Sequence, residues 1–233
     1  MHLNVNQKLV VMKKVALCFI VLLMCLGCSN DAEDQTAGLN NDGNEDSEVT
    51  ITAKVSIPDS NFEQALIDLR FDDILDGEVD KDRVDFITEL ILDDRGISDL
   101  TGISEFDDLV NLNIRNNEIT SLDVSNNTNL LFVWAEGNEL ETVDVSGLSS
   151  LEKLGLDRNR LRLVDVRTNI GLQLLTLSEN QLGSIDVSSN NALTDFTVVD
   201  NPLGCILVNE TQLNAIPADW SKDEGDSYSL DCE

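Results

Sequence analysis

The segment LVNLNIRNNEITSLDVS, residues 109–125, decides the fold because it returns as LLFVWAEGNELETVDVS at residues 130–146. Two further copies follow at residues 151–167 and 172–188, and a final, looser copy begins at residue 193. The first leucines are separated by 21 residues each time, without an insertion: Leu109, Leu130, Leu151, Leu172 and Leu193. A fixed period of this length predicts an array in which each unit packs on its neighbours.

The first half of each unit reads LxLxxN. Its alternation predicts a short strand with the leucines on one face, and copies must stack in parallel, about 4.8 Å apart, to bury those leucines. The asparagine comes where the strand ends, and its amide can donate to and accept from the backbone of the adjacent coil. We therefore predict a structural ladder, formed by Asn117, Asn138, Asn159, Asn180 and Asn201. An earlier unit, from Ile87, carries Arg95 at this position.

The second half of each unit alternates apolar residues around an aspartate, which predicts a column of outward carboxylates. Its members are Asp123, Asp144, Asp165 and Asp186. One carboxylate per coil supplies far fewer oxygens than calcium requires, so a solvated face that opposes aggregation is favoured over a cation site. No metal site and no cofactor are predicted.

Both ends of a stacked array require a cap. At the front, residues 57–71 place Phe62, Leu66 and Leu69 on one helical face, and Asp59 provides a start signal. At the back, residues 205–233 keep little of the repeat, and Trp220 is expected to cover the last coil.

The N-terminal segment MKKVALCFIVLLMCLGC, residues 12–28, has two lysines followed by an apolar run, as an export signal does. Its ending resembles the lipobox of bacterial lipoproteins, which implies lipidation of Cys28 after removal of residues 1–27. Cys25 stands where that motif usually has leucine, so cleavage without lipidation stays open. Residues 28–55 contain few large apolar residues and are interpreted as a disordered acidic tether.

Removal of residues 1–27 changes the charge balance from 15 − 44 = −29 to 12 − 44 = −32, because it deletes three lysines and no acid. Such a chain is expected to avoid nucleic acid and anionic lipid, so that its contact with a membrane is limited to the lipid anchor. The lone histidine, His2, leaves with the same segment. Two cysteines then remain besides Cys28, and we expect Cys205 and Cys232 to form a disulfide.

These repeats resemble the leucine-rich-repeat family, and their LDVSxN half is similar to the 21-residue units of Bacteroidetes-type surface lipoproteins. The resemblance implies an α/β fold that is mostly β: a right-handed solenoid with a parallel concave sheet, an N-terminal helical cap and a disulfide-stapled C-terminal cap. The expected boundaries are 56–86 for the first cap, 87–204 for the repeats and 205–233 for the second cap.

The alternation that buries Val133 turns Phe132 and Trp134 outward, onto the concave sheet that this family commonly uses for ligands. Gly155, opposite Trp134, is expected to leave room for a guest against the indole. Aromatic residues surrounded by charged and amide side chains are typical of a binding hot spot. The predicted ligand-binding residues are Phe132, Trp134, Asn113, Arg115, Glu136, Lys153, Asp157 and Arg158.

We interpret the chain as a monomeric, exported lipoprotein of the outer membrane or cell surface that binds a protein partner. A glycan ligand and a structural spacer without a specific ligand are the alternatives. No catalytic residue is predicted: the mature chain has no histidine, and the carboxylates Glu136 and Asp157 have no lid or deep pocket. Arg115 and Arg158 are expected to keep both acids ionised.

Overall fold

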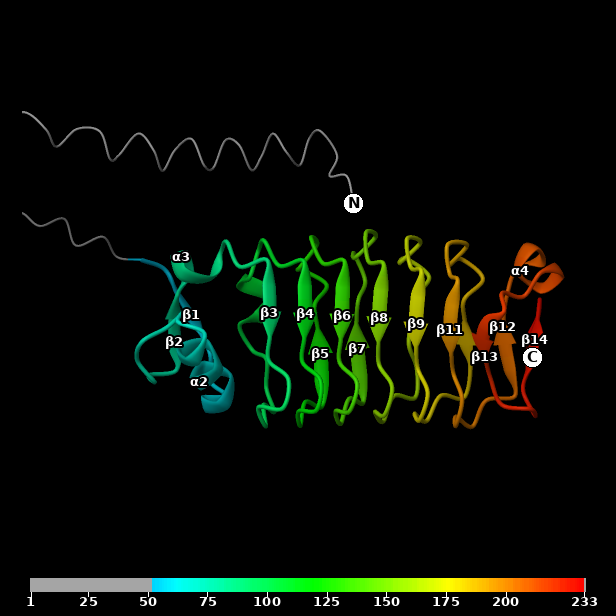
Figure 1. Ribbon diagram of the computed structural model, residues 1–233, viewed down its shortest axis with the longest axis horizontal. Coiled ribbons are helices and arrows are strands. Elements are labelled where there is room, and N and C mark those ends of the chain that lie inside the picture. The colour runs from blue at the N-terminus through cyan, green and yellow to red at the C-terminus, as the bar shows by residue number, and fades with distance from the viewer. Residues whose placement is uncertain (1–51, 233) are drawn as a thin grey trace, which may run out of the picture. The chain divides into compact units, whose positions relative to one another are not determined.

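The computed structural model describes residues 52–232, which form a row of stacked coils (Figure 1). The predicted export segment, the lipidation site Cys28 and most of the predicted tether lie outside the described residues. Four short elements precede the repeats: β1 (Lys54–Ser56), α2 (Ser60–Asp68), β2 (Glu78–Asp80) and α3 (Lys81–Val84). β1 and β2 pair antiparallel, so residues 54 and 55, which end the segment interpreted as a tether, belong to a strand.

A seven-stranded parallel sheet runs along one side of the coils, as the LxLxxN pattern predicts. Its spatial order is β3-β4-β6-β8-β9-β11-β13. The strands are β3 (Glu89–Ile91), β4 (Asn111–Asn113), β6 (Phe132–Trp134), β8 (Lys153–Gly155), β9 (Leu174–Thr176), β11 (Asp195–Thr197) and β13 (Asp219–Ser221). Neighbouring strands pair in register, so equivalent positions of successive coils form straight rows across the sheet.

The other side of the coils carries two smaller parallel sheets. They consist of β5 (Ser121–Asp123) with β7 (Thr142–Asp144), and of β10 (Ile185–Asp186), β12 (Cys205–Leu207) and β14 (Ser227–Ser229). Two short helices complete the structure: the 3-10 helix η2 (Ile103–Glu105) and α4 (Glu210–Asn214). Residues 163–165, between β7 and β10, form no strand. The described part of the chain is therefore a mostly-β parallel solenoid, in agreement with the predicted fold class.

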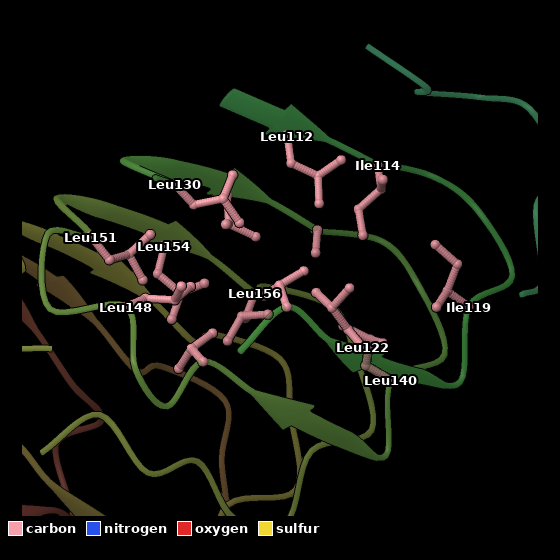
Figure 2. Close-up of a cluster of buried hydrophobic side chains, with 14 of the residues drawn as sticks. Leu112, Ile114, Ile119, Leu122, Leu130, Leu140, Leu148, Leu151, Leu154 and Leu156 are labelled. Atoms are coloured by element: carbon pink, nitrogen blue, oxygen red, sulfur yellow. The ribbon is translucent and has the colours of Figure 1, made fainter. Parts of the chain in front are cut away.

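The core is a continuous stack of aliphatic side chains between the two sides of each coil. Leu112, Leu130, Leu154 and Leu156 point into this space (Figure 2) and are fully buried. Burial of such side chains contributes about 25 cal/mol per Å² of apolar surface. A single coil cannot enclose its own leucines, so stacking provides the stability of the fold.

The predicted asparagine ladder is confirmed. In Asn159, Nδ2 donates to the carbonyls of Ala135 and Leu156, each at 3.0 Å, and Oδ1 accepts from the Leu140 N–H at 3.0 Å. Equivalent bonds are made by Asn117, Asn138, Asn180 and Asn201. Each side chain thus links adjacent coils through backbone groups that would otherwise be buried and unpaired.

A second ladder, which the sequence analysis missed, follows the LDVS motif. The fully buried Asn169 donates to the carbonyls of Val145 and Leu148, each at 2.9 Å. Asn127 and Asn190 make the equivalent bonds, and Gln212 replaces the asparagine in the last coil. The column was hard to recognise because Leu148 interrupts it.

The aspartates of the second column point outward as predicted, and each also closes a turn. Oδ1 of Asp123 accepts from the Ser125 N–H at 3.0 Å, and Asp144, Asp165 and Asp186 accept in the same way from the residue two positions later. This is an Asx turn, in which the side chain replaces a backbone acceptor. A hydrogen bond from the Arg167 side chain lowers the pKa of Asp165 to about 2.

The N-terminal helix begins where Asp59 predicts. One carboxylate oxygen of Asp59 accepts from the N–H groups of Asn61 and Phe62, at 2.9 and 3.0 Å, and so caps α2. The other oxygen accepts from the N–H groups of Ser98 and Asp99, at 2.8 and 3.0 Å, in the first repeat. Asp59 therefore joins the helix to the solenoid. The ring of Phe62 stacks on that of Phe106, with the ring centroids 6.1 Å apart.

Replacement of Asp59 by asparagine is expected to lower the free energy of unfolding by about 1–2 kcal/mol at pH 7, because the amide has one acceptor oxygen for two sets of donors. Burial opposes ionisation, but hydrogen bonds from Ser98, Phe62 and Asp99 outweigh it and lower the pKa of Asp59 below its ordinary value of 3.8. A lowered folded-state pKa stabilises the fold above the unfolded pKa, and that contribution is lost as the pH falls through the folded pKa.

Urea unfolding of both proteins at several pH values measures this effect. The difference between the wild type and Asp59→Asn should shrink from pH 7 toward pH 2. A difference that stays constant over this range would contradict a role for the ionised carboxylate.

The C-terminal segment is stapled as predicted, by a disulfide between Cys205 and Cys232. Trp220 packs edge-on against Phe196, with the ring centroids 5.2 Å apart, and covers the last regular coil. The segment also extends both sides of the solenoid, because β12 pairs with β10 and β13 pairs with β11. Residues 205–232 are thus an irregular continuation of the array as well as its cap.

Candidate functional site

The outward side chains of the seven-stranded sheet form a surface that we call the sheet face. In β6, Val133 is buried while Phe132 and Trp134 are half-buried on the sheet face. The register places Phe132 between Asn111 and Lys153, and it places Trp134 between Asn113 and Gly155. The structure therefore brings together the residues that the alternation predicts to be neighbours.

Trp134 is held by an ion pair on one side. The Arg115 guanidinium lies 4.5 Å from the centre of the indole ring. It also donates twice to Glu136, from Nε to Oε2 at 2.7 Å and from Nη2 to Oε1 at 2.9 Å. Asn113 adds local support, because its Oδ1 accepts from the Arg115 N–H at 3.1 Å. A bidentate pair of this kind fixes both side chains, and the indole with them.

The room expected above Gly155 is not there. A methyl group built on Gly155 would lie 2.6 Å from Oε1 of Glu136 and 3.0 Å from Cε3 of Trp134. The missing side chain accommodates the protein's own carboxylate and indole. The prediction that a guest lies at Gly155 is therefore wrong, because Glu136 turns toward Arg115 across that position.

A second cation, the ammonium group of Lys153, lies near the ring of Phe132. Nζ of Lys153 lies 5.8 Å from the centre of the phenyl ring. Within residues 52–232, Lys153 forms no ion pair with a carboxylate, whereas Arg115 is neutralised by Glu136. The ammonium group of Lys153 is therefore an uncompensated positive charge in the interior of the sheet face.

Asp157 lies on the sheet face beside Glu136 and is half-buried. Burial raises the pKa of Asp157, and this is the largest effect. The nearby Thr176 hydroxyl, the Ser178 N–H and the charge of Arg158 lower the pKa, whereas the charge of Glu136 raises it, and the net shift is upward. Its Oδ1 accepts from the Ser178 N–H at 2.7 Å. At Asp157, burial therefore outweighs the effect of the Arg158 charge on the pKa.

Arg158 lies at the end of the strand and is exposed, with a positive φ of 55°. No ion pair or side-chain hydrogen bond holds it within the described part of the chain. It belongs to the edge of the sheet face, while Asp157 belongs to its interior. The predicted residues therefore form one cluster, with Arg158 at its margin.

The chemistry of this cluster is suited to recognition. Arg115, Glu136 and Trp134 are fixed by their mutual contacts. Arg115 and Glu136 stand 21 residues apart, at equivalent positions of successive coils. That spacing is the signal by which the ion pair could have been predicted. The cluster offers an open surface with apolar and charged groups, as the centre of a protein interface does.

A family model described as the leucine-rich-repeat (LRR) domain of the endo-beta-N-acetylglucosaminidase EndoS matches residues 76–180. The match covers the first repeats and the region before them. No curated protein matches the chain.

Among solved structures, the chain is similar to the functional domain of InlJ from Listeria monocytogenes, a domain that includes a cysteine ladder. The identity is 29%, the TM-score is 0.59, and the match covers 68% of this chain and 38% of the InlJ chain. This chain therefore spans well under half of that relative.

Two further internalins of the same organism also match. Internalin C2 is 18% identical with a TM-score of 0.42, covering 74% of this chain and 94% of that chain. InlF is 17% identical with a TM-score of 0.37, covering 74% and 71%. Residues 52–232 contain no helix of sufficient length and apolarity to cross a membrane.

Proposed function

We propose that this chain, a solenoid whose repeats match a leucine-rich-repeat (LRR) domain model, is a binding protein of the bacterial cell surface. It recognises a protein partner through the sheet face and catalyses no reaction. The similarity to the InlJ domain supports a binding role in general. The finer parts of the proposal are a Bacteroidetes-type lipoprotein anchored through Cys28 in the outer membrane, and a monomeric state.

One observation carries the proposal: two aromatic residues lie side by side on an accessible sheet and are fixed there by cations. Large aromatic side chains with few rotatable bonds, held in place before binding, lose little entropy when a partner covers them. A surface that binds no partner does not need its aromatic side chains to be held in place. The arrangement therefore favours specific binding over a structural spacer.

A protein is favoured over a glycan because of the same cations. A sugar that stacks on an aromatic ring requires a free ring face, and Arg115 already covers one face of Trp134. Lys153 approaches Phe132 in a similar way. Protein hot spots, in contrast, commonly combine arginine with aromatic residues at their centre.

Replacement of both Phe132 and Trp134 by alanine is expected to weaken partner binding at least about tenfold, because truncation of hot-spot residues costs roughly 2 kcal/mol or more. The partner is first isolated by pull-down on the immobilised wild-type chain and identified, and its affinity for both proteins is then measured by calorimetry.

Leu163→Ala is the matched control, because Leu163 is 69% exposed and lies outside the sheet face. Its affinity should stay within about twofold of the wild type. Equal binding by the double variant would place the contact outside the sheet face, and failure to capture any partner would support a spacer. Retention of glycans on an array, lost in the double variant, would support the glycan alternative.

A further inference from the structure

Besides Arg158 at its edge, the sheet face carries two cations, Arg115 and Lys153, which differ in whether a carboxylate neutralises them. Arg115 is paired with Glu136 at 2.7 Å. Lys153 lies at the centre of the sheet, in β8, and has no ion pair among the described residues. Of the other three lysines within residues 52–232, Lys54 pairs with Asp80 at 2.9 Å and Lys81 contacts Asp85, Glu105 and Asp107. Nζ of Lys222 donates to the backbone carbonyls of Asp223 and Asp226. Lys153 thus lies at the middle of the sheet without a carboxylate partner among the described residues, although the chain has a net charge of −29.

The neighbours of Lys153 in its row are apolar. The register pairs it with Phe132 on one side and with Leu174 on the other, and all three side chains are half-buried. Adjacent strands are about 4.8 Å apart, so the row presents an apolar group, an ammonium and a second apolar group within about 10 Å.

The ends of the same row are acidic. Glu89 lies in β3 at one end, and Asp195 and Asp219 lie in β11 and β13 at the other. Asp195 is two strands from Lys153, about 10 Å, which is close to the Debye length at physiological salt. A long polyanion laid along the row would therefore face like charges on both sides of the ammonium.

We infer that the partner inserts a single carboxylate, from an aspartate or a glutamate, opposite Lys153, with apolar side chains beside it that contact Phe132 and Leu174. This inference rests on the proposed function, because it specifies what the sheet face recognises. The net charge of −29 favours a basic partner at long range. The partner's carboxylate is thus a single acidic group within a mainly basic partner. Its pairing with Lys153 fixes where the partner lies along the row.

The test uses a displayed library of random 12-residue peptides, selected on the full chain. Peptides retained by the wild type should be enriched in one acidic residue flanked by apolar ones. Lys153→Glu should bind these peptides about fivefold more weakly, the effect of losing a partly exposed ion pair. Exchange of the acidic residue of the peptide for lysine should restore binding to Lys153→Glu and weaken binding to the wild type.

Lys153→Gln removes the charge but keeps most of the aliphatic stem, so it serves as the neutral variant. Thermal unfolding of both variants checks that the solenoid is intact. Selection without acidic enrichment, or equal affinity of the selected peptides for Lys153→Glu, would overturn the inference. So would a library that yields no peptide dependent on the sheet face. The two failures are distinguishable: peptides that require Phe132 and Trp134 but not Lys153 overturn the inference alone, whereas peptides that bind the Phe132→Ala/Trp134→Ala variant as tightly as the wild type contradict the proposed function as well.

Discussion

Replacement of Asn159 by alanine is expected to lower the free energy of unfolding by about 3 kcal/mol, although the residue contacts no ligand. Its amide lies in the middle of the first ladder and is 8% exposed. The substitution leaves the Leu140 N–H without its acceptor and removes donors from the carbonyls of Ala135 and Leu156. A buried donor without a partner carries its full desolvation cost.

The ladder limits this loss in a specific way. The carbonyl of Ala135 also accepts from Asn138 at 3.1 Å, and that of Leu156 also accepts from Asn180 at 2.9 Å. Each carbonyl therefore keeps one bond when Asn159 is removed. The N–H of Leu140 has no second acceptor among the described hydrogen bonds, so it accounts for most of the expected cost.

Urea unfolding followed by circular dichroism measures the change, and Asn126→Ala is the control because Asn126 is exposed. The control should stay within about 0.5 kcal/mol of the wild type. If Asn159→Ala were no less stable than the control, the hydrogen bonds of the ladder would contribute no measurable stability, and leucine packing alone would hold the coils together.

Much of the fold could be predicted because the period of the sequence is the period of the structure. The 21-residue spacing fixes which residues become neighbours, and the alternation around Val133 fixes which side chains are buried. The second ladder was missed because its column is interrupted by Leu148 and shifts by one residue to end in Gln212. A pattern search depends on identical residues, whereas the backbone requires only a donor or a suitable side chain at that place.

The sequence predicts which residues lie in the candidate site, but it does not predict how their side chains are oriented. The alternation turns Phe132 and Trp134 outward, but it does not specify the rotamers of long charged side chains. Glu136 turns toward Arg115 and occupies the place above Gly155 because two charge-assisted hydrogen bonds outweigh exposure to water. The burial of Asp157 likewise depends on its neighbours in adjacent coils, which a single repeat does not show.

Removal of the disulfide by Cys205→Ala and Cys232→Ala is expected to destabilise the C-terminal end by about 3.5 kcal/mol, the value for closing a loop of this length. The two residues are 27 positions apart, and the loop between them contains Trp220 and the strands β13 and β14. The last coil of an array has a neighbour on one side, so its contacts are fewer than those of a central coil. Without the disulfide, Trp220 can leave Phe196 while the central coils stay folded.

Hydrogen exchange distinguishes this local opening from global unfolding. Residues 205–232 of the double variant should exchange faster than in the wild type, while residues 109–188 keep their protection. Addition of a reducing agent should reproduce the effect in the wild type and leave the double variant unchanged. Equal loss of protection along the whole solenoid would contradict a local role and would mean that the coils unfold as one cooperative unit.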